Sequence, residues 1–295
     1  MTNASATPAA TGTYRTAVIS GASTGIGRAT ALALADAGWW VYAGVRDLSA
    51  APSSRSRGSI VPIHLDVTDP DSINAAIMSI TADQGGRPVD VLISNAGVGQ
   101  LAPMQTVPLA ELRAVLDVNL VGAVALTQAV LPLMTTGSRL VFLGSVGDRI
   151  TMPFGGPLTS SKWAIASIAE AFRLELAAIG IDVVLIEPGS INTPAVDKVE
   201  TAAAHTIEVL KQSNPELATR FATAAKIAVT NERRGSSPDE VARTILHAVT
   251  INRPRTRYLT GHHAHLLAAL GILPDRVFDR LRLRLFHQPT QQEKR

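Results

Sequence analysis

The 295-residue sequence contains no cysteine, and aromatic residues make up only 4% of it. The absence of cysteine excludes disulfide bonds, thiol nucleophiles and cysteine-ligated metal sites. Charged residues make up 17% and the net charge is +3. A nucleic-acid-binding protein usually carries a denser basic patch, so we expect no nucleic-acid partner. The histidines at 262, 263 and 265 are loosely spaced, and we expect no metal site.

The sequence also lacks the segments that target a chain to a membrane or to secretion. No apolar run was expected to approach the ~20 residues that span a bilayer. Residues 1–12 are small and polar, without the basic and apolar regions of a signal peptide. We therefore expect a cytoplasmic protein with no membrane span and a disordered tail over residues 1–13.

What the sequence does contain is an apolar, β-prone run that ends in three spaced glycines, Gly21, Gly25 and Gly27. The alanine- and leucine-rich run 29–37 follows at once. This pattern predicts a strand, a tight turn and the start of a helix. Glycine permits a positive φ and a close backbone approach, and a helix N-terminus offers unpaired N–H groups to a phosphate. The stretch therefore predicts a dinucleotide site.

Apolar runs and helical patterns then alternate along the chain. We expect further strands at 39–45, 60–67, 89–94, 139–143 and 182–186, and helices at 69–82, 109–133 and 162–178. The strands are continuous apolar runs, as in a parallel sheet that is covered on both faces. The predicted fold class is α/β, a single Rossmann-like, doubly wound parallel sheet with helices on both faces. Such sheets bind ligands at the carboxyl ends of their strands.

The pattern changes after residue 193. Residues 195–231 have helical spacing. Residues 238–250 begin with a good helix start and are expected to form a helix, and residues 257–260 are expected to form a short last strand. Residues 265–286 form a helical stretch interrupted at Gly271 and Pro274. We expect a dinucleotide-binding domain over 14–262, with a helical lid at about 195–235, and a C-terminal helical extension over 263–295. The apolar face of the lid, together with residues 152–154, suggests an apolar substrate; packing against the sheet is the alternative.

Several motifs at strand ends carry a family resemblance. Ser20-Gly21-x-x-x-Gly25-x-Gly27, Asn95-Ala96-Gly97 and Pro188-Gly189 occur in this order. With them the chain resembles the classical short-chain dehydrogenase/reductases over roughly residues 16–260. The resemblance implies that the pyrophosphate lies along Gly21, Gly25, Ile26 and Gly27, the adenine beside Asp66 and Val67, the ribose above Asn95, Ala96 and Gly97, and the nicotinamide carboxamide at Pro188, Gly189, Ile191 and Thr193.

The resemblance also implies catalytic roles for Asn119, Ser145 and Lys162. Asn119 matches the asparagine that supports an active-site water, and the other two match the catalytic serine and lysine. The family's tyrosine lies four residues before the lysine and thirteen after the serine. Both spacings lead to Leu158, which cannot donate, accept or transfer a proton.

Four residues are candidates for the missing proton donor. Ser145 and Thr159 have hydroxyls whose pKa is too high for easy transfer. Asp148 is a carboxyl three residues after Ser145, although a surface residue paired with Arg149 is the alternative reading. Lys162 would act through an ordered water with Asn119, or else only anchors the ribose.

The residues at the end of the second expected strand indicate which dinucleotide is bound. Sites for NAD place a carboxylate there, and sites for NADP offer an arginine to the 2′-phosphate. Here Val45 is followed by Arg46, and Arg suits bidentate phosphate contact. Ser23 and Thr24 add hydroxyls. We expect NADP rather than NAD; the alternative is a solvated Arg46 paired with Asp47.

Two functions remain open at this point. The first is an NADP-dependent reductase of an apolar small molecule with atypical proton donation. The second is a dinucleotide-binding protein with a non-redox role, either a cyclase, dehydratase or isomerase, or a catalytically silent binding protein. In the family, the helices corresponding to 109–133 and 162–178 often pack across a two-fold axis, so a homodimer or homotetramer is expected.

Overall fold

A computed structural model describes residues 14–53 and 58–289. The tail expected at 1–13 lies outside these described residues. Seven parallel strands form one sheet in the order β3-β2-β1-β4-β5-β6-β7. The strands are β1 (Thr16–Ser20), β2 (Trp40–Val45), β3 (Ser59–His64), β4 (Val91–Ser94), β5 (Arg139–Leu143), β6 (Asp182–Pro188) and β7 (Arg257–Thr260). The chain reverses its direction of travel across the sheet at β1, and the predicted doubly wound α/β fold is confirmed.

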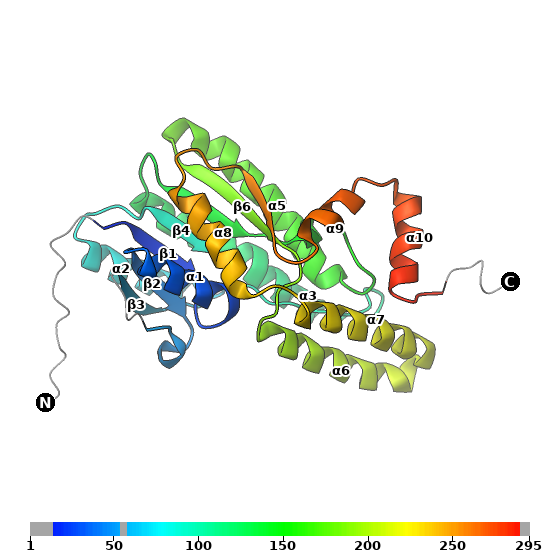
Figure 1. Cartoon of the computed structure of the whole chain (residues 1–295). Coiled ribbons are helices and arrows are strands. Elements are labelled where there is room, and N and C mark those ends of the chain that lie inside the picture. The colour runs from blue at the N-terminus through cyan, green and yellow to red at the C-terminus, as the bar shows by residue number, and fades with distance from the viewer. Residues whose placement is uncertain (1–13, 54–57, 290–295) are drawn as a thin grey trace, which may run out of the picture.

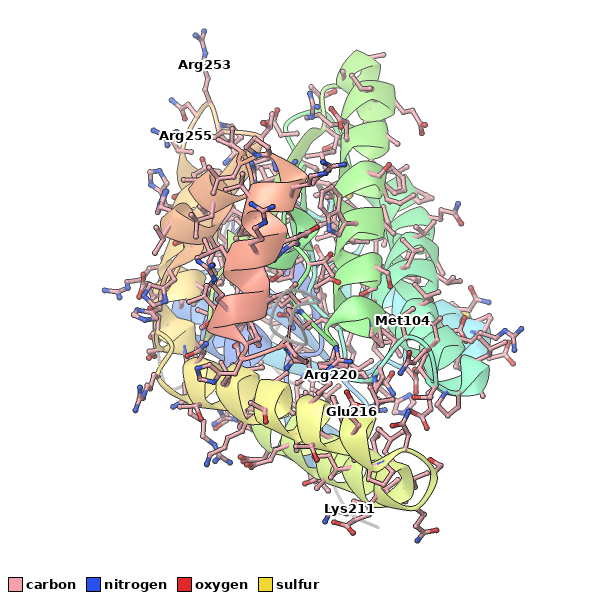
Figure 2. The ribbon with its side chains drawn as sticks, turned by 90° about the vertical axis from the view of Figure 1, so that its right-hand side faces the viewer. Met104, Lys211, Glu216, Arg220, Arg253 and Arg255 are labelled. Carbon is pink, nitrogen blue, oxygen red and sulfur yellow. The ribbon has the colours of Figure 1, made fainter. Side chains whose placement is uncertain are left out.

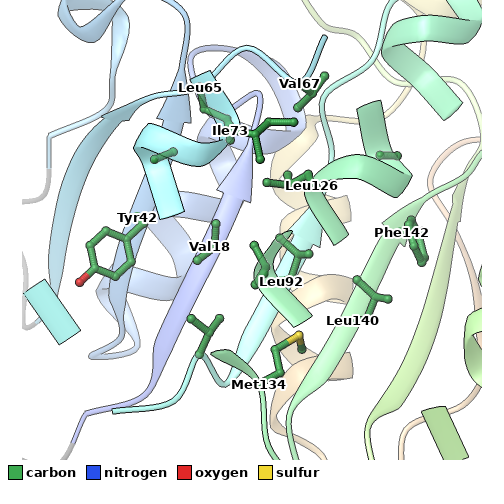
Figure 3. Packing of buried hydrophobic residues seen from close by; sticks show 14 of the residues in the cluster. Val18, Tyr42, Leu65, Val67, Ile73, Leu92, Leu126, Met134, Leu140 and Phe142 are labelled. Atoms are coloured by element: carbon green, nitrogen blue, oxygen red, sulfur yellow. The ribbon is translucent and has the colours of Figure 1, made fainter. Parts of the chain in front are cut away.

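Helices cover both faces of this sheet (Figure 1). Helices α1 (Gly25–Asp36) and α8 (Pro238–Thr250) pack on one face, where Ile19, Leu34 and Ile245 share a core. Helices α2 (Pro70–Gln84), α4 (Gly122–Val130) and α5 (Gly156–Leu176) pack on the other. Figure 3 shows this second core, in which Val18 and Leu126 are buried together. Because Val18 and Ile19 point to opposite faces, each strand needs an unbroken apolar run.

The helix expected at 109–133 is divided into successive segments. Helix α3 (Leu109–Leu116) leads into a π-helical turn, η2 (Asp117–Val121), and then into α4 and a short 3₁₀ turn, η3 (Leu131–Leu133). The 25 residues together are long and apolar enough to cross a membrane, so the expectation that no run approaches this length was wrong. The core helix of a soluble protein meets the same criteria, and this one buries Ala123, Leu126 and Val130 against the sheet.

Residues 195–231 form two helices rather than one stretch. Helix α6 (Ala195–Ser213) ends at Asn214, and α7 (Pro215–Arg233) begins directly after it. The Asn214 side chain accepts the N–H of Leu217, which caps the new helix. The pair lies side by side (Figure 1) and buries its own apolar cluster. Phe221 of this cluster packs edge-on against Phe154, with ring centroids 5.4 Å apart, so part of the apolar face of these two helices serves packing.

Element boundaries differ from expectation near the site. Helix α5 begins at Gly156, six residues before the expected start at Lys162. Pro157 is tolerated because first-turn N–H groups have no helical partner. Strand β6 runs on to Pro188, and β3 stops at His64. Helices α9 (Ala264–Leu270) and α10 (Asp275–Leu285) form the C-terminal extension, broken between Gly271 and Pro274 as expected.

Candidate active site

The glycine turn after β1 has the space and the donors that a dinucleotide phosphate requires. Gly21 has a φ of +67°, and a Cβ there would lie 2.9 Å from the Ala96 Cα. A Cβ on Gly27 would lie 2.3 Å from the Gly21 carbonyl oxygen. Helix α1 has no side-chain cap from Thr24 and no acidic residue in its first turn. No carboxylate of these residues therefore competes for the free N–H groups and the positive dipole end of α1. The turn fits a dinucleotide phosphate.

Asn95 joins the turn after β4 to the glycine turn. Its Nδ2 donates to the carbonyl oxygens of Ser20 at 2.9 Å and Gly21 at 3.1 Å. The Ser20 hydroxyl accepts the N–H groups of Asn95 and Ala96, each at 3.0 Å. Gly97 comes next, and a Cβ on it would meet Asn119 Oδ1 at 3.3 Å. The structure therefore brings these predicted residues together.

The segment after β6 completes this end of the sheet. A Cβ on Gly25 would lie 3.2 Å from the Thr193 methyl group, so this segment touches the glycine turn. The N–H of Gly189 donates to the Thr260 carbonyl. The N–H of Ile191 donates to Glu232 Oε2 at 3.1 Å. Burial raises the pKa of Glu232, and this carboxyl ties the end of α7 to the segment.

The residues expected at the adenine end lie one strand away. The Asp66 carboxylate accepts the N–H of Thr68 at 2.9 Å and its hydroxyl at 2.7 Å, and these bonds lower the pKa of Asp66. The positive charge of Arg46 also lowers the pKa of Asp66, to a smaller extent. The Arg46 guanidinium is therefore close enough to Asp66 to interact with its charge. Asp47 instead accepts the N–H of Ser49, and forms no ion pair with Arg46 within the described chain.

The remaining nucleotide-site residues frame the same edge. The carbonyl oxygen of Val67 is 2.7 Å from where a Cβ on Gly122 would be. Ser23 is half-buried, and Thr24, at the start of α1, is exposed. Ile26 is half-buried beside the sheet's core. Their role at a nucleotide site stays a prediction.

Asn119 lies in the π-helical turn and is buried. Its Oδ1 accepts the N–H of Val98 at 2.7 Å, and its Nδ2 donates to the Val98 carbonyl and to the Ser161 hydroxyl, both at 2.9 Å. Ser161 in turn donates to the Leu158 carbonyl at 2.7 Å. Asn119 thus connects the segment after β4 to the first turn of α5.

Leu158 and Lys162 lie one helical turn apart on the same face of α5. The Lys162 ammonium donates to the Leu143 carbonyl at the end of β5, at 2.8 Å. Burial lowers the pKa of Lys162 to about 8, while the charge of Asp148 acts in the opposite direction. A lysine with this pKa is a stronger acid than an ordinary one.

Ser145 ends the segment after β5. Its hydroxyl accepts the N–H of Gly147 at 3.0 Å and donates to the Pro188 carbonyl at 3.4 Å. Thr159 donates to the Gly155 carbonyl at 3.0 Å and is buried. The Thr159 hydroxyl is therefore occupied by its own helix, whereas Ser145 stands between two strand ends.

Asp148 lies in the short 3₁₀ turn η4 (Val146–Asp148) and is buried, not a surface residue. Its Oδ1 is 3.0 Å from the Arg257 guanidinium and 3.9 Å from that of Arg149. Its Oδ2 has no hydrogen-bond partner among the described residues. Burial and the neighbouring Glu187 raise the pKa of Asp148 to about 8. Asp148 donates its N–H to the Ser145 carbonyl and lies in a cluster with two arginines.

The three tyrosines have partners away from this cluster, as expected. The Tyr42 hydroxyl donates to Asp83 at 2.5 Å. The Tyr258 hydroxyl accepts the N–H of Arg255 at 2.9 Å, and the Tyr14 ring stacks on Trp40 at 5.0 Å between centroids. None of them contacts Ser145 or Lys162.

Sequence reasoning missed two features of this site. Glu187 is an acidic residue directly after the apolar run 183–186 of β6, and that contrast is a signal that could have led to the cluster with Asp148. Glu232 had no local signal, because only the tertiary structure brings α7 to Ile191. In the part of the chain that the structure describes, no three His, Asp or Glu side chains are grouped to hold a metal ion.

Comparison with known proteins agrees with this geometry. Residues 15–204 match the family model for short chain dehydrogenases. The chain is 30% identical over 94% of its length to an NADPH-dependent 3-dehydrocapnine reductase of Ornithobacterium rhinotracheale, covering 99% of that protein. It is 31% identical over 92% of its length to a 3-ketodihydrosphingosine reductase of Bacteroides thetaiotaomicron, covering 97% of it.

Among solved structures, a short chain dehydrogenase/reductase from Burkholderia phymatum in complex with NAD has the same fold. The TM-score is 0.73 at 22% identity, over 91% of this chain and 95% of that one. The matched fold, the glycine turn and the loops that meet it lead to one assignment: the chain belongs to the short-chain dehydrogenase/reductase family.

Proposed function

We propose that the protein is an NADP-dependent reductase of an apolar small molecule, in which a group other than tyrosine supplies the proton. The observation that carries this proposal is the pair Leu158 and Lys162. They lie on one face of α5, and the chain's three tyrosines are bonded or stacked elsewhere. In this proposal, Leu158 occupies the place of the family's tyrosine.

In the proposed complex, residues at the carboxyl ends of the strands hold the dinucleotide, which supplies hydride when bound. The pyrophosphate lies on Gly21, Ser23, Thr24, Gly25, Ile26 and Gly27, the adenine end beside Arg46, Asp66 and Val67, and the nicotinamide end among Asn95, Ala96, Gly97, Pro188, Gly189, Ile191 and Thr193. Arg46 favours a 2′-phosphate because its guanidinium forms no ion pair with a carboxylate of the residues that the structure describes.

Lys162 is the proposed source of the proton. Its pKa of about 8 makes the ammonium a competent acid near neutral pH. Ser145 orients the substrate oxygen from the end of β5, and Asn119 keeps the first turn of α5 in place through Ser161. Thr159 is a poorer donor because its hydroxyl is buried and bonded to Gly155.

The relatives support the reductive direction and the cofactor. Both are named as reductases, and one is named as NADPH-dependent. The exposed side chains of Val121, Trp163 and Leu174 on the helices at 109–133 and 156–176 support the proposed homodimer or homotetramer. A cytoplasmic location, a domain over 14–262 and a lid at about 195–235 remain predictions.

The alternative is a dinucleotide-binding protein with a non-redox role. It is favoured by one observation, the aliphatic side chain of Leu158 beside Lys162. Loss of a positioned acid or base commonly reduces the rate of the catalysed reaction by about 10² to 10⁴. A reduction of this size is compatible with a site that binds the dinucleotide without catalysing hydride transfer.

One assay distinguishes the two. The purified chain is titrated with NADPH and with NADH by fluorescence, and then incubated with NADPH and a panel of carbonyl, imine and quinone compounds. The reductase predicts NADPH binding and loss of NADPH absorbance with at least one class of substrate. Tight binding without oxidation by any of the panel would support the non-redox role, and the absence of any nucleotide binding would contradict both.

A further inference from the structure

The C-terminal extension presents an exposed apolar corner that the site does not use. Every residue from Gly271 to Val277 is exposed. Ile272 is 85% exposed, and the nearby apolar residues Leu266 and Val277 are 55% and 50% exposed. The side chains of Leu273 and Leu285 are exposed as well. Contiguous exposed apolar residues of this kind mark interaction surfaces in soluble proteins.

The opposite face of α10 and the residues after it contact the rest of the chain at a few points. Phe278 and Phe286 are buried. Arg282 donates to the Thr151 carbonyl at 2.6 Å. Beyond the helix, Gln288 exchanges hydrogen bonds with Arg220 of α7, each at 3.1 Å. The extension is therefore docked with one face inward, so the exposed apolar residues form a fixed outer face.

Figure 1 shows α10 at the outermost edge of the molecule, beyond α9. Figure 2, turned so that this edge faces the viewer, shows α10 in front, with Arg220 near its lower end. No other element covers the outer side of α10 in this view. A partner can therefore approach the outer side of α10 without meeting the sheet.

Three arginines accompany the apolar corner. Arg276, Arg280 and Arg284 are exposed and form no ion pair with any residue that the structure describes. Of the two aspartates on α10, Asp279 is paired with Arg282, which leaves Asp275 as the acidic group opposing them. Leu273, Val277, Arg280 and Arg284 follow one another at helical spacing of three or four residues, so apolar and basic groups share the outer face.

We infer that this outer face, formed by Ile272, Leu273, Arg276, Val277, Arg280 and Arg284, docks on the surface of an anionic phospholipid bilayer. Exposed aliphatic side chains enter the boundary between headgroups and acyl chains, while arginines meet lipid phosphates. A second copy of this chain fits the face less well. A two-fold contact sets each patch against itself, which would bring the three unpaired arginines of both copies into one interface.

The contacts of α9 place the outer face close to the candidate active site. Helix α9 packs beside the turn η4, and a Cβ on Gly271 would lie 3.2 Å from the Arg149 carbonyl oxygen. The face is thus anchored next to the segment that follows Ser145. The inference does not rest on the proposed reaction, since vesicle binding is measured without substrate or cofactor.

The test is flotation of the full chain with vesicles of phosphatidylcholine alone or mixed with phosphatidylglycerol. We expect flotation with the mixed vesicles, at least tenfold weaker binding to phosphatidylcholine, and weaker binding in high salt. Substitution of Ile272 and Leu273 by Ser, or of Arg276, Arg280 and Arg284 by Gln, is expected to reduce binding at least tenfold.

Two matched variants serve as controls. Met78→Ser removes an apolar side chain on α2 that is 73% exposed, and replacement of Arg243, Arg253 and Arg255 by Gln removes three exposed arginines near β7. Both are expected to bind vesicles as the unmodified chain does. Equal loss in the control variants, or no flotation at all, would overturn the inference. A lower oligomeric mass of the Ile272 and Leu273 variant by light scattering, without vesicle binding by the parent, would assign the face to a second copy.

Discussion

The buried carboxyl groups of Asp148 and Glu187 share the guanidinium of Arg257, whose Nη2 lies 3.0 Å from Asp148 Oδ1 and 2.7 Å from Glu187 Oε1. Arg149 donates to both oxygens of Glu187 from the other side, at 2.6 and 3.0 Å. The arginines lower the pKa of Glu187, whereas burial and Glu187 itself raise the pKa of Asp148. These shifts favour the charged form of Glu187 and the protonated form of Asp148.

Asp148→Asn is expected to remove a pH dependence of stability. The folded pKa of Asp148, about 8, is above its ordinary value of about 3.9, so the folded state holds a proton that the unfolded state releases. This group's stabilisation is complete below about pH 4 and is lost as the pH rises toward about 8, at up to about 1.4 kcal/mol per pH unit. The melting temperature of the variant should change less with pH between about pH 5 and pH 7 than that of the unmodified chain.

Thermal unfolding followed by circular dichroism measures this effect. Glu187 contributes in the opposite direction below its ordinary pKa of about 4.3, so the chosen range leaves its contribution constant. Asp36→Asn, at an exposed position ending α1, is the control and should keep the slope of the unmodified chain. An unchanged slope in Asp148→Asn would show that Asp148 is charged in the folded protein.

Leu158→Tyr is expected to raise carbonyl reductase activity by about 10² to 10⁴, the usual worth of a positioned acid. The new hydroxyl would stand one turn from Lys162, whose charge lowers a phenol pKa. The measurement is kcat/KM with NADPH and a ketone. Leu158→Phe has the ring without the hydroxyl, and its activity should remain at the level of the unmodified chain. A gain in both variants would contradict the proposed role of the hydroxyl.

Lys162→Arg separates proton donation from charge. Arginine keeps the positive charge that would anchor the ribose, but it is too weak an acid to give up a proton. We expect NADPH binding within about threefold of the unmodified chain and turnover reduced by about 10² or more. Single-turnover absorbance and fluorescence titration give the two quantities. Full turnover in Lys162→Arg would exclude Lys162 as the donor.

Gly27→Ala is expected to abolish NADPH binding and to cost about 1 to 3 kcal/mol of stability through overpacking. The added methyl group would lie 2.3 Å from the Gly21 carbonyl and 2.5 Å from Asn95 Nδ2, so the glycine turn and its asparagine would both have to move. Gly38→Ala is the comparison: nothing lies within 4 Å of its Cβ, although its φ is +90°. It should lose stability and keep its affinity for NADPH.

Arg46→Ala tests the choice of nucleotide. Loss of a charge-assisted bond to a 2′-phosphate costs about 1.5 to 3 kcal/mol, which is roughly a tenfold to hundredfold loss of NADPH affinity. Affinity for NADH should stay unchanged, because NADH has no such phosphate. Arg87→Ala, whose guanidinium stacks over the Tyr14 ring at 4.3 Å, should alter neither affinity. Equal weakening of both nucleotides by Arg46→Ala would refute the specificity.

The sequence by itself determined the fold class and the edge of the sheet at which the site forms. Unbroken apolar runs such as that of β1 require cover on both faces, and the spaced glycines after β1 permit a tight turn with positive φ into a helix. These are local properties, and the structure agrees with them. The π-helical turn at Asn119 and the start of α5 at Gly156 were not predicted, because helical spacing alone does not set a helix's boundaries.

Only the tertiary structure decided what surrounds each polar group. Asp148, Glu187 and Arg257 lie 39 and 70 residues apart along the chain, yet β5, β6 and β7 are neighbours in the sheet and bring the three together. Desolvation and charge then act at distances of a few ångströms, and no sequence spacing encodes them. The same holds for Glu232 at Ile191, and for the outer face of α10, which exists because Phe278 and Phe286 pack inward.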